Sequence, residues 1–309
     1  MATKIFVGNY KGGVGKTTSV FHISNYITEL EADKKVLMID LDPQCSLSEI
    51  CMTKHKKNLE DLEDEECLNY ILDMYNKKFR KYNNIDIKLD VEKLIKRQSE
   101  GIDFIPSSLY YKENKRGLDI IIGDFQKYED SIFILSQFIL DSKLDESYDY
   151  IIFDCPPSNN IITQSAFLIS DYYLIPTIMD NISAKGVRHY VNSVDNIYNN
   201  FCKNHEDAEV MKVVFKEKPH LLGVFETLYK YNVSNGETID SIKRELSENK
   251  TLEIEKILNE YDNIIFNTRI CNYIDIARGT AVGEQNKKTE GYRELTKEIL
   301  DRINKHENK

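Results

Sequence analysis

The sequence contains no apolar run long enough to cross a membrane. Its longest apolar stretches, such as Leu221–Phe225 and Tyr150–Phe153, are far shorter than the roughly 20 residues that span a bilayer. The charged, apolar and small-residue pattern of a secretory signal is also missing before the strand-like Lys4–Gly8. We therefore expect a soluble, cytoplasmic protein without stable membrane association.

The sequence also lacks any C-x-x-C pair. Scattered cysteines argue against a disulfide framework and against a zinc or iron–sulfur site, because both need cysteines at defined spacings. We expect reduced thiols at all six positions, which are Cys45, Cys51, Cys67, Cys155, Cys202 and Cys271.

The sequence also has fewer basic than acidic residues. The chain has 41 Lys and Arg against 51 Asp and Glu, a net charge of −10. Such a molecule repels DNA and anionic lipid at long range, so any polyanion binding must come from a local basic patch. Composition alone therefore gives no support to a nucleic-acid partner.

What the sequence does contain is a regular alternation of strand-like and helix-like segments. The strand-like segments are rich in β-branched or aromatic residues, and several are apolar on consecutive positions, as strands covered on both faces require. This pattern predicts an α/β fold with a mostly parallel central sheet of about seven strands and helices on both faces. The segments are Lys4–Gly8, Lys35–Ile39, Ile102–Pro106, Tyr150–Asp154, Tyr172–Pro176, Leu221–Thr227 and Asn263–Thr268.

We expect residues 1–309 to form a single domain. Its least regular part, around residues 52–100, has a basic cluster followed by an acidic one, which predicts a helical, charged insertion in solvent; a partner-docking surface is the alternative. The last stretch is amphipathic and invites two interpretations, packing on the sheet or targeting to a membrane surface. Its apolar positions are Tyr292, Leu295, Ile299 and Ile303.

A glycine-rich loop follows the first predicted strand and opens the first predicted helix. It reads Lys-Gly-Gly-Val-Gly-Lys-Thr-Thr over residues 11–18. The strict phosphate-loop template G-x-x-x-x-G-K-[ST] places its first glycine at position 10, where this chain has Tyr10. The chemistry survives that departure, because the remaining glycines let backbone N–H groups converge on phosphate oxygens beside the positive end of a helix.

The loop predicts a nucleotide site with Mg²⁺. Lys16 is expected to reach the β and γ phosphates, and the Thr17 hydroxyl is expected to bind the metal ion. The residues expected to hold the phosphates are Gly12, Gly13, Val14, Gly15, Lys16, Thr17 and Thr18.

These residues resemble the deviant Walker A box of the ParA/MinD class of ATPases, in which a second lysine, here Lys11, precedes the usual one. The resemblance implies a single P-loop ATPase domain. It also implies that Lys11 crosses to the phosphates of a partner subunit, so that the site is complete only in a nucleotide-sandwich homodimer.

Two further boxes stand where this family has them. Asp40-Leu41-Asp42-Pro43-Gln44 resembles the D-x-D-P-Q box that follows the second strand. That match implies that Asp40 orients or deprotonates the attacking water and that Asp42 belongs to a switch segment near the γ phosphate. The strand ending in Asp154 resembles Walker B, whose carboxylate holds Mg²⁺ through water. The Phe266–Val282 stretch is a weaker landmark, expected near the adenine.

The resemblance is to the ParA family of DNA-partitioning ATPases. It implies a slow, partner-stimulated ATPase that dimerises on ATP, binds DNA non-specifically on the nucleoid, and drives plasmid, phage or chromosome partition. The implied partner is a centromere-binding adaptor, ParB-like or of the ribbon-helix-helix type. A MinD-like membrane-associated positioning ATPase is the alternative, which the D-P-Q box and the polar C-terminal tail disfavour. A metabolic or electron-transfer member of the same superfamily is a third possibility, which the missing cysteine pair disfavours.

The DNA contacts have the thinnest support in the sequence. They would have to come from scattered basic residues, for each of which an ordinary solvated charge is the simpler interpretation. The candidates are Arg188, Lys230, Arg278, Lys287 and Lys288.

Overall fold

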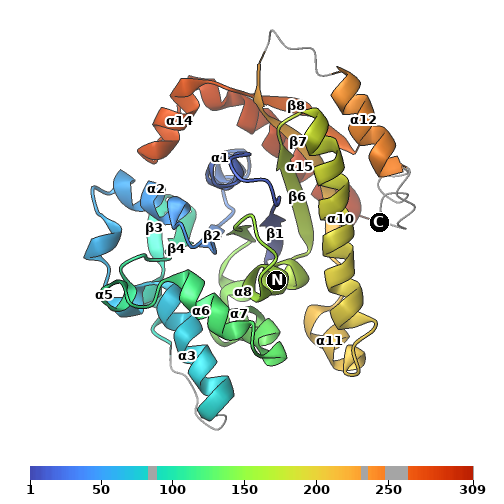
Figure 1. Ribbon diagram of the computed structural model, residues 1–309. Helices are drawn as coiled ribbons and strands as arrows, with labels where there is room; N and C mark the ends of the chain where they lie inside the picture. Colours follow the sequence, from blue (N-terminus) through green and yellow to red (C-terminus); the bar gives the residue numbers. More distant parts are fainter. Residues whose placement is uncertain (83–88, 231–235, 248–263, 309) are drawn as a thin grey trace.

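The computed structural model describes residues 1–82, 89–230, 236–247 and 264–308. One eight-stranded sheet runs through it in the order β3-β4-β2-β5-β1-β6-β7-β8, with helices on both faces (Figure 1). Among the described strands, all neighbouring pairs are parallel except β3 with β4. The strands are β1 (Thr3–Val7), β2 (Val36–Asp40), β3 (Lys96–Ser99), β4 (Ile102–Ile105), β5 (Tyr150–Asp154), β6 (Tyr172–Thr177), β7 (His220–Tyr229) and β8 (Ile265–Cys271).

The consecutive apolar residues of the central strands serve two cores. Leu37 and Ile39 of β2 lie in the core on one face of the sheet, whereas Val36 and Met38 lie in the core on the other face. Successive side chains of a strand point to opposite faces, so a strand covered on both sides must be apolar at every position. The predicted α/β architecture is confirmed.

Each face of the sheet has its own set of helices. One core contains side chains of α1 (Lys16–Leu30), α2 (Ser46–Lys54), α14 (Ile274–Ala281) and α15 (Glu290–Glu307). The other contains side chains of α3 (Leu68–Lys81), α6 (Leu118–Phe125), α7 (Ile134–Asp141), α9 (Ile161–Ile169), α10 (Asn181–Cys202), α11 (Ala208–Phe215) and α12 (Gly236–Ser247). The short helices are α4 (Val91–Leu94), α5 (Tyr111–Asn114) and α8 (Leu144–Ser147).

The described sheet has one strand more than the about seven predicted. The added strand, β3, lies at the edge and pairs antiparallel with β4. It reads Lys-Arg-Gln-Ser, so it offers no apolar alternation from which a strand would be predicted. Charged residues suit an edge strand, because they discourage pairing with another chain. Of the seventh predicted strand, Asn263 lies outside the described residues.

The region around residues 52–100 is less solvated than its charge suggested. It contains β3, and α3 buries Leu68, Ile71, Leu72 and Tyr75 in the core. The charge pattern marked the outer face of this region, whereas its inner face belongs to the same core as the sheet.

The C-terminal helix α15 packs on the sheet. Its apolar positions Tyr292, Leu295, Ile299 and Ile303 are all buried in the core that α1 covers. The apolar stripe of this helix, for which membrane targeting was one interpretation, is therefore buried against the sheet. None of the helices in the described residues combines the length and the apolar character needed to cross a membrane.

Candidate functional site

Three neighbouring strands deliver the predicted site residues to one edge of the sheet. In the order β2-β5-β1, Asp40 of β2 is the register partner of Asp154 of β5, and Asp154 is also opposite Val7 of β1. The glycine-rich loop leaves β1 directly after Val7 and leads into α1. Because parallel strands end at the same edge, the loop and both carboxylates meet there.

The loop has the backbone that its glycines allow. Gly13 and Gly15 adopt positive φ angles of 70° and 77°, which side chains disfavour, and Gly15 is the N-cap of α1. A Cβ placed on Gly12 or Gly13 would meet no atom within 4 Å, so this side of the loop borders open space. The first turn of α1 has no acidic residue and no side-chain cap, which leaves its positive end available to an anion.

Polar side chains from two other segments brace the loop. Asn9 donates from Nδ2 to the Pro176 carbonyl at 2.8 Å and accepts from the Lys11 N–H at 3.0 Å. Thr227 of β7 donates to the Val14 carbonyl at 2.9 Å and lies 3.1 Å from the Thr177 carbonyl. The sequence analysis assigned no role to Asn9 or Thr227, because nothing in their local pattern distinguishes them from core residues.

Lys16 is a buried cation with few partners. Its side chain is 7% exposed, and Nζ donates to the Lys11 carbonyl at 3.3 Å. Burial lowers the pKa of Lys16, whereas the nearby carboxylates of Asp154 and Asp42 oppose that effect. A phosphate at the loop would give this ammonium the charged partner that a buried cation needs.

Asp154 is a buried carboxylate whose oxygens lack well-formed hydrogen bonds within the described residues. It is 1% exposed, and no group in the described parts of the chain reaches regular hydrogen-bond geometry with either carboxylate oxygen. Burial raises the pKa of Asp154 well above its ordinary value, the Asp40 charge adds to this, and the Thr17 hydroxyl counteracts it. An orphaned carboxylate beside a threonine hydroxyl fits a divalent cation, so the residues present suit Mg²⁺.

Asp40 is fully buried and its oxygens already have donors. Oδ2 accepts from the backbone N–H of Ser48 at 2.8 Å and from its hydroxyl at 2.6 Å, while Oδ1 accepts from the Asp42 N–H at 3.1 Å. Ser107 completes the network, since its N–H donates to the Ser48 hydroxyl and its own hydroxyl donates to the Asp40 carbonyl. Burial raises the pKa of Asp40 to about 6, against the lowering effect of Ser48.

Asp42, two residues further on, is only partly buried. Its Oδ1 accepts from the Gln44 N–H at 2.9 Å, and its charge acts on Lys16. Of the two aspartates in the D-x-D-P-Q box, Asp42 is therefore the one that solvent reaches.

Lys11 has its own set of partners, which differ from the surroundings of Lys16. Its ammonium lies 2.6 Å from Asp180 Oδ2 and 3.1 Å from the Ser183 hydroxyl, at the start of α10. Partial burial raises the pKa of Asp180, but the hydrogen bonds from Lys11 and Ser183 outweigh it and leave that pKa lowered. The two lysines of the loop thus occupy different environments.

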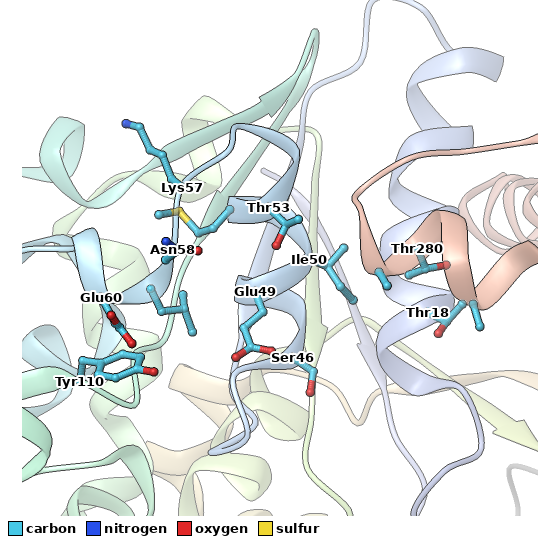
Figure 2. Close-up of a pocket in the computed structure, with 14 residues that line it drawn as sticks. Thr18, Ser46, Glu49, Ile50, Thr53, Lys57, Asn58, Glu60, Tyr110 and Thr280 are labelled. Atoms are coloured by element: carbon cyan, nitrogen blue, oxygen red, sulfur yellow. The ribbon is translucent and has the colours of Figure 1, made fainter.

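A cavity of about 660 Å³ adjoins the end of the loop. Figure 2 shows Thr18 and Thr280 at one wall, Glu60 and Tyr110 at the other, and Ser46 and Glu49 of α2 between them. Ala277 and Thr280 belong to the Phe266–Val282 stretch, which this cavity places next to the loop. That the adenine binds next to this stretch stays a prediction.

The basic residues predicted to contact DNA do not form one patch. Arg188 lies on α10 and Arg278 on α14, helices that cover opposite faces of the sheet. Lys287 and Lys288 form part of the short turn Lys287–Thr289 after α14, where the Lys288 ammonium lies 5.0 Å from the centre of the Tyr273 ring. Lys230 follows β7 and is exposed.

Fold and site together define a P-loop α/β protein with the second lysine of the deviant Walker A type. The chain belongs to the AAA_31 family, described as an AAA domain, whose profile matches residues 2–208, and its relatives include proteins of the ParA family.

The relatives include a virulence plasmid ParA family protein of Chlamydia psittaci. It is 28% identical over 263 residues, which cover 82% of this chain and 86% of the relative. A putative plasmid partition protein from Borrelia burgdorferi, solved bound to AMPPNP, has a TM-score of 0.64 at 21% identity and covers 99% of this chain and 100% of its own. A cobyrinic acid a,c-diamide synthase from Mycobacterium smegmatis, solved with an ATP analogue and magnesium, has a TM-score of 0.64 at 18% identity, covering 98% and 96%. At these identities the two structures establish the shared fold alone.

Proposed function

We propose that the chain is a ParA-type ATPase that dimerises on ATP and binds DNA non-specifically. It would act with a ParB-like or ribbon-helix-helix centromere-binding adaptor in plasmid, phage or chromosome partition. The observation that carries the proposal is the different placement of the two loop lysines: Lys16 is buried near Asp154 and Asp42, whereas Lys11 is partly exposed and paired with Asp180.

The residues at the loop have distinct roles toward ATP and Mg²⁺. The backbone of residues 12–15, the start of α1 and Lys16 would hold the phosphates, with Thr18 beside them. Thr17 and Asp154 would hold Mg²⁺, Asp154 through water, and the ion would neutralise charge on the phosphate oxygens. The AMPPNP-bound Borrelia protein and the ATP-analogue-bound synthase support this assignment, since both share the fold.

We propose that Asp40 orients or deprotonates the attacking water and that Asp42 belongs to a switch segment near the γ phosphate. A general base needs a free lone pair within hydrogen-bond reach of the water. Asp40 Oδ1 accepts one hydrogen bond, from the Asp42 N–H, and so keeps a lone pair, while Ser48 holds Oδ2 in place. Burial raises the pKa of Asp40 to about 6, which suits a group that takes up a proton. Asp42 is partly exposed and electrostatically coupled to Lys16.

Dimerisation follows from the position of Lys11. With its ammonium at the start of α10 and 36% of its side chain exposed, Lys11 can exchange the single carboxylate of Asp180 for the more highly charged phosphates of a neighbouring subunit. Lys16 already serves the phosphates of its own subunit, so the second lysine is the group left to act across an interface.

The partition function rests on the relatives rather than on the fold. The synthase shares the fold equally well, so the fold does not separate a partition ATPase from a metabolic enzyme. The 28% identity to a plasmid ParA family protein over 82% of the chain favours partition. We expect the ATP-bound protein on the nucleoid and the remainder in the cytoplasm.

DNA binding in defined nucleotide states tests the proposal. The full chain is mixed with duplex DNA of arbitrary sequence, with ATP and Mg²⁺, with ADP, or without nucleotide, at two salt concentrations. We expect binding only with ATP, and weaker binding at the higher salt because phosphate contacts release counterions. An ATP state that ignores DNA at low salt but sediments with anionic vesicles would replace the proposal with the MinD-like alternative.

A further inference from the structure

A small pocket at the C-terminal end of α3 is lined mainly by cations. Its volume is about 210 Å³, and five of its seven lining residues are Lys or Arg. Three of these five cations come from α3 and two from the segment 112–116, so separate parts of the chain converge on the pocket. The lining residues are Asp73, Asn76, Lys77, Arg80, Lys81, Lys112 and Arg116.

The acid in this pocket is covered by the cations. Asp73 is 2% exposed and accepts from Lys77 at 3.0 Å and from Lys112 at 2.7 Å, while Arg116 lies 3.0 Å from its other oxygen. The Lys77 and Lys112 side chains remain 46% and 36% exposed. Lys81 is exposed and forms no ion pair with any residue whose surroundings the structure describes. The pocket therefore presents positive charge to solvent.

Structural needs do not account for this many cations. One buried carboxylate and the C-terminal end of a helix, worth about half a negative charge, would be neutralised by about two cations. Adding Asp124, which lies 3.2 Å from Arg116, still leaves a surplus of more than two positive charges among the five. The surplus stands on a chain whose net charge is −10.

The floor of the pocket also offers a polar group without a partner. Asn76 is 6% exposed and lines the pocket, and its Oδ1 accepts no hydrogen bond within the described ranges. A half-turn of the amide would direct its N–H₂ group to the same place. Arg80 is held in position, with its guanidinium 3.8 Å from the centre of the Tyr128 ring. A fixed guanidinium, partly exposed lysine ammonium groups and an amide with an unpartnered oxygen are groups that can bind a phosphate.

We propose that this α3 pocket binds the phosphate backbone of duplex DNA. The inference rests on the proposed function and locates its DNA contact on α3, away from the residues that the sequence suggested. A polymer is favoured over a small phosphate compound because the surplus charge is exposed rather than enclosed: Lys77 is 46% exposed, and Lys81 is also exposed. Phosphate contacts of this kind carry affinity without sequence preference.

The test neutralises two exposed lysines of the pocket, and Asp73 keeps Lys112 and Arg116 as ion-pair partners when Lys77 is replaced. Lys77→Gln with Lys81→Gln removes two charges one helical turn apart on α3. The matched control, Lys212→Gln with Lys216→Gln, removes two exposed charges at the same spacing in and just after α11. Both variants and the wild type are titrated with fluorescent duplex DNA, with an ATP analogue and Mg²⁺, between about 50 and 200 mM salt.

We expect the α3 variant to bind DNA at least about tenfold more weakly at low salt. Its plot of log affinity against log salt should be shallower by about two units of slope, because each phosphate contact contributes close to one unit. The control should match the wild type. Wild-type affinity and slope in the α3 variant would overturn the inference while the proposed function stands. A wild type that binds no DNA overturns both, and binding of anionic vesicles through these lysines without DNA binding overturns the choice of DNA.

Discussion

The Lys11 ammonium lies 2.6 Å from the Asp180 carboxylate, so the lysine that the proposed dimer needs already has a partner within its own subunit. Dimerisation must replace that contact. Because both side chains are more than a third exposed, the pair is worth only about 0.2–1 kcal/mol. It can therefore bias the equilibrium without preventing assembly.

Weakening this contact should favour the dimer. Asp180→Asn keeps a side-chain oxygen to accept from the Ser183 N–H at the start of α10 but removes the charge that holds Lys11. We expect half-maximal dimerisation at an ATP concentration up to about fivefold lower, as the energy of an exposed ion pair allows. Light scattering across an ATP titration measures it. An unchanged midpoint would show that the contact does not compete with assembly.

Removing the second lysine should have the opposite effect. Lys11→Ala should bind ATP yet remain a monomer in light scattering, because Lys16 still serves the phosphates of its own subunit. Lys34→Ala is the control, since Lys34 also makes a partly exposed ion pair, with Asp149 at 2.9 Å. The sandwich model would be abandoned if Lys11→Ala dimerised like the wild type.

Three substitutions at the loop and the D-x-D-P-Q box should separate binding from turnover. Lys16→Ala should abolish nucleotide binding, since it removes the buried cation at the phosphates. Asp40→Ala should keep binding and dimerisation and lose about 10²–10⁴-fold in turnover, the usual contribution of a general base. Calorimetry and phosphate release distinguish the two. If instead Asp42→Ala alone loses turnover, Asp42 is the base.

Ser48 should matter for stability more than its size suggests. Ser48→Ala removes the hydroxyl that donates to Asp40 and accepts from the Ser107 N–H, both buried. Leaving those groups short of a partner should lower the free energy of unfolding by about 1–3 kcal/mol. Ser46→Ala, on the same helix and only partly buried, should change it little. Denaturant melts of both variants measure the difference, and equal stabilities would mean that the network adds nothing.

The burial of Asp40 predicts a dependence of stability on pH. Burial raises its folded-state pKa to about 6, above the ordinary value of about 3.9, so the folded chain holds this proton more tightly than the unfolded chain. The resulting stabilisation is fully present below about pH 4 and is lost as the pH rises through about 6. Asp40→Asn should flatten the stability profile in that window, whereas the exposed Asp33→Asn should not. A wild-type profile that rises steadily between these pH values would contradict the prediction.

The sequence predicted the strands and the loop because their signals are local. Consecutive apolar residues such as Tyr150–Phe153 identify a doubly covered strand, and glycine spacing identifies the loop. Parallel pairing then brings Asp40 and Asp154 together, since both end their strands. The edge strand β3 was missed, because Lys96 and Arg97 suit an edge and carry no alternation.

The remaining parts of the site depend on contacts between distant positions. Asp180 lies 169 residues from Lys11, and Thr227 lies 213 residues from Val14. Neither has a neighbouring pattern that marks its partner. The motif predicts a role for Asp40 toward water, whereas its distant donor Ser107 has no local signal in the sequence: Ser48 donates to the Asp40 carboxylate and Ser107 to its backbone carbonyl.

The helix α15 sets a thermodynamic limit on how this protein could reach a membrane. Lifting it from the sheet would expose Tyr292, Leu295, Ile299 and Ile303, each at most 2% exposed in the fold. At about 1.5–3 kcal/mol for each side chain, release would cost about 6–12 kcal/mol. A typical domain has only about 5–15 kcal/mol of total stability. Detaching this helix to anchor the protein on lipid would therefore approach global unfolding.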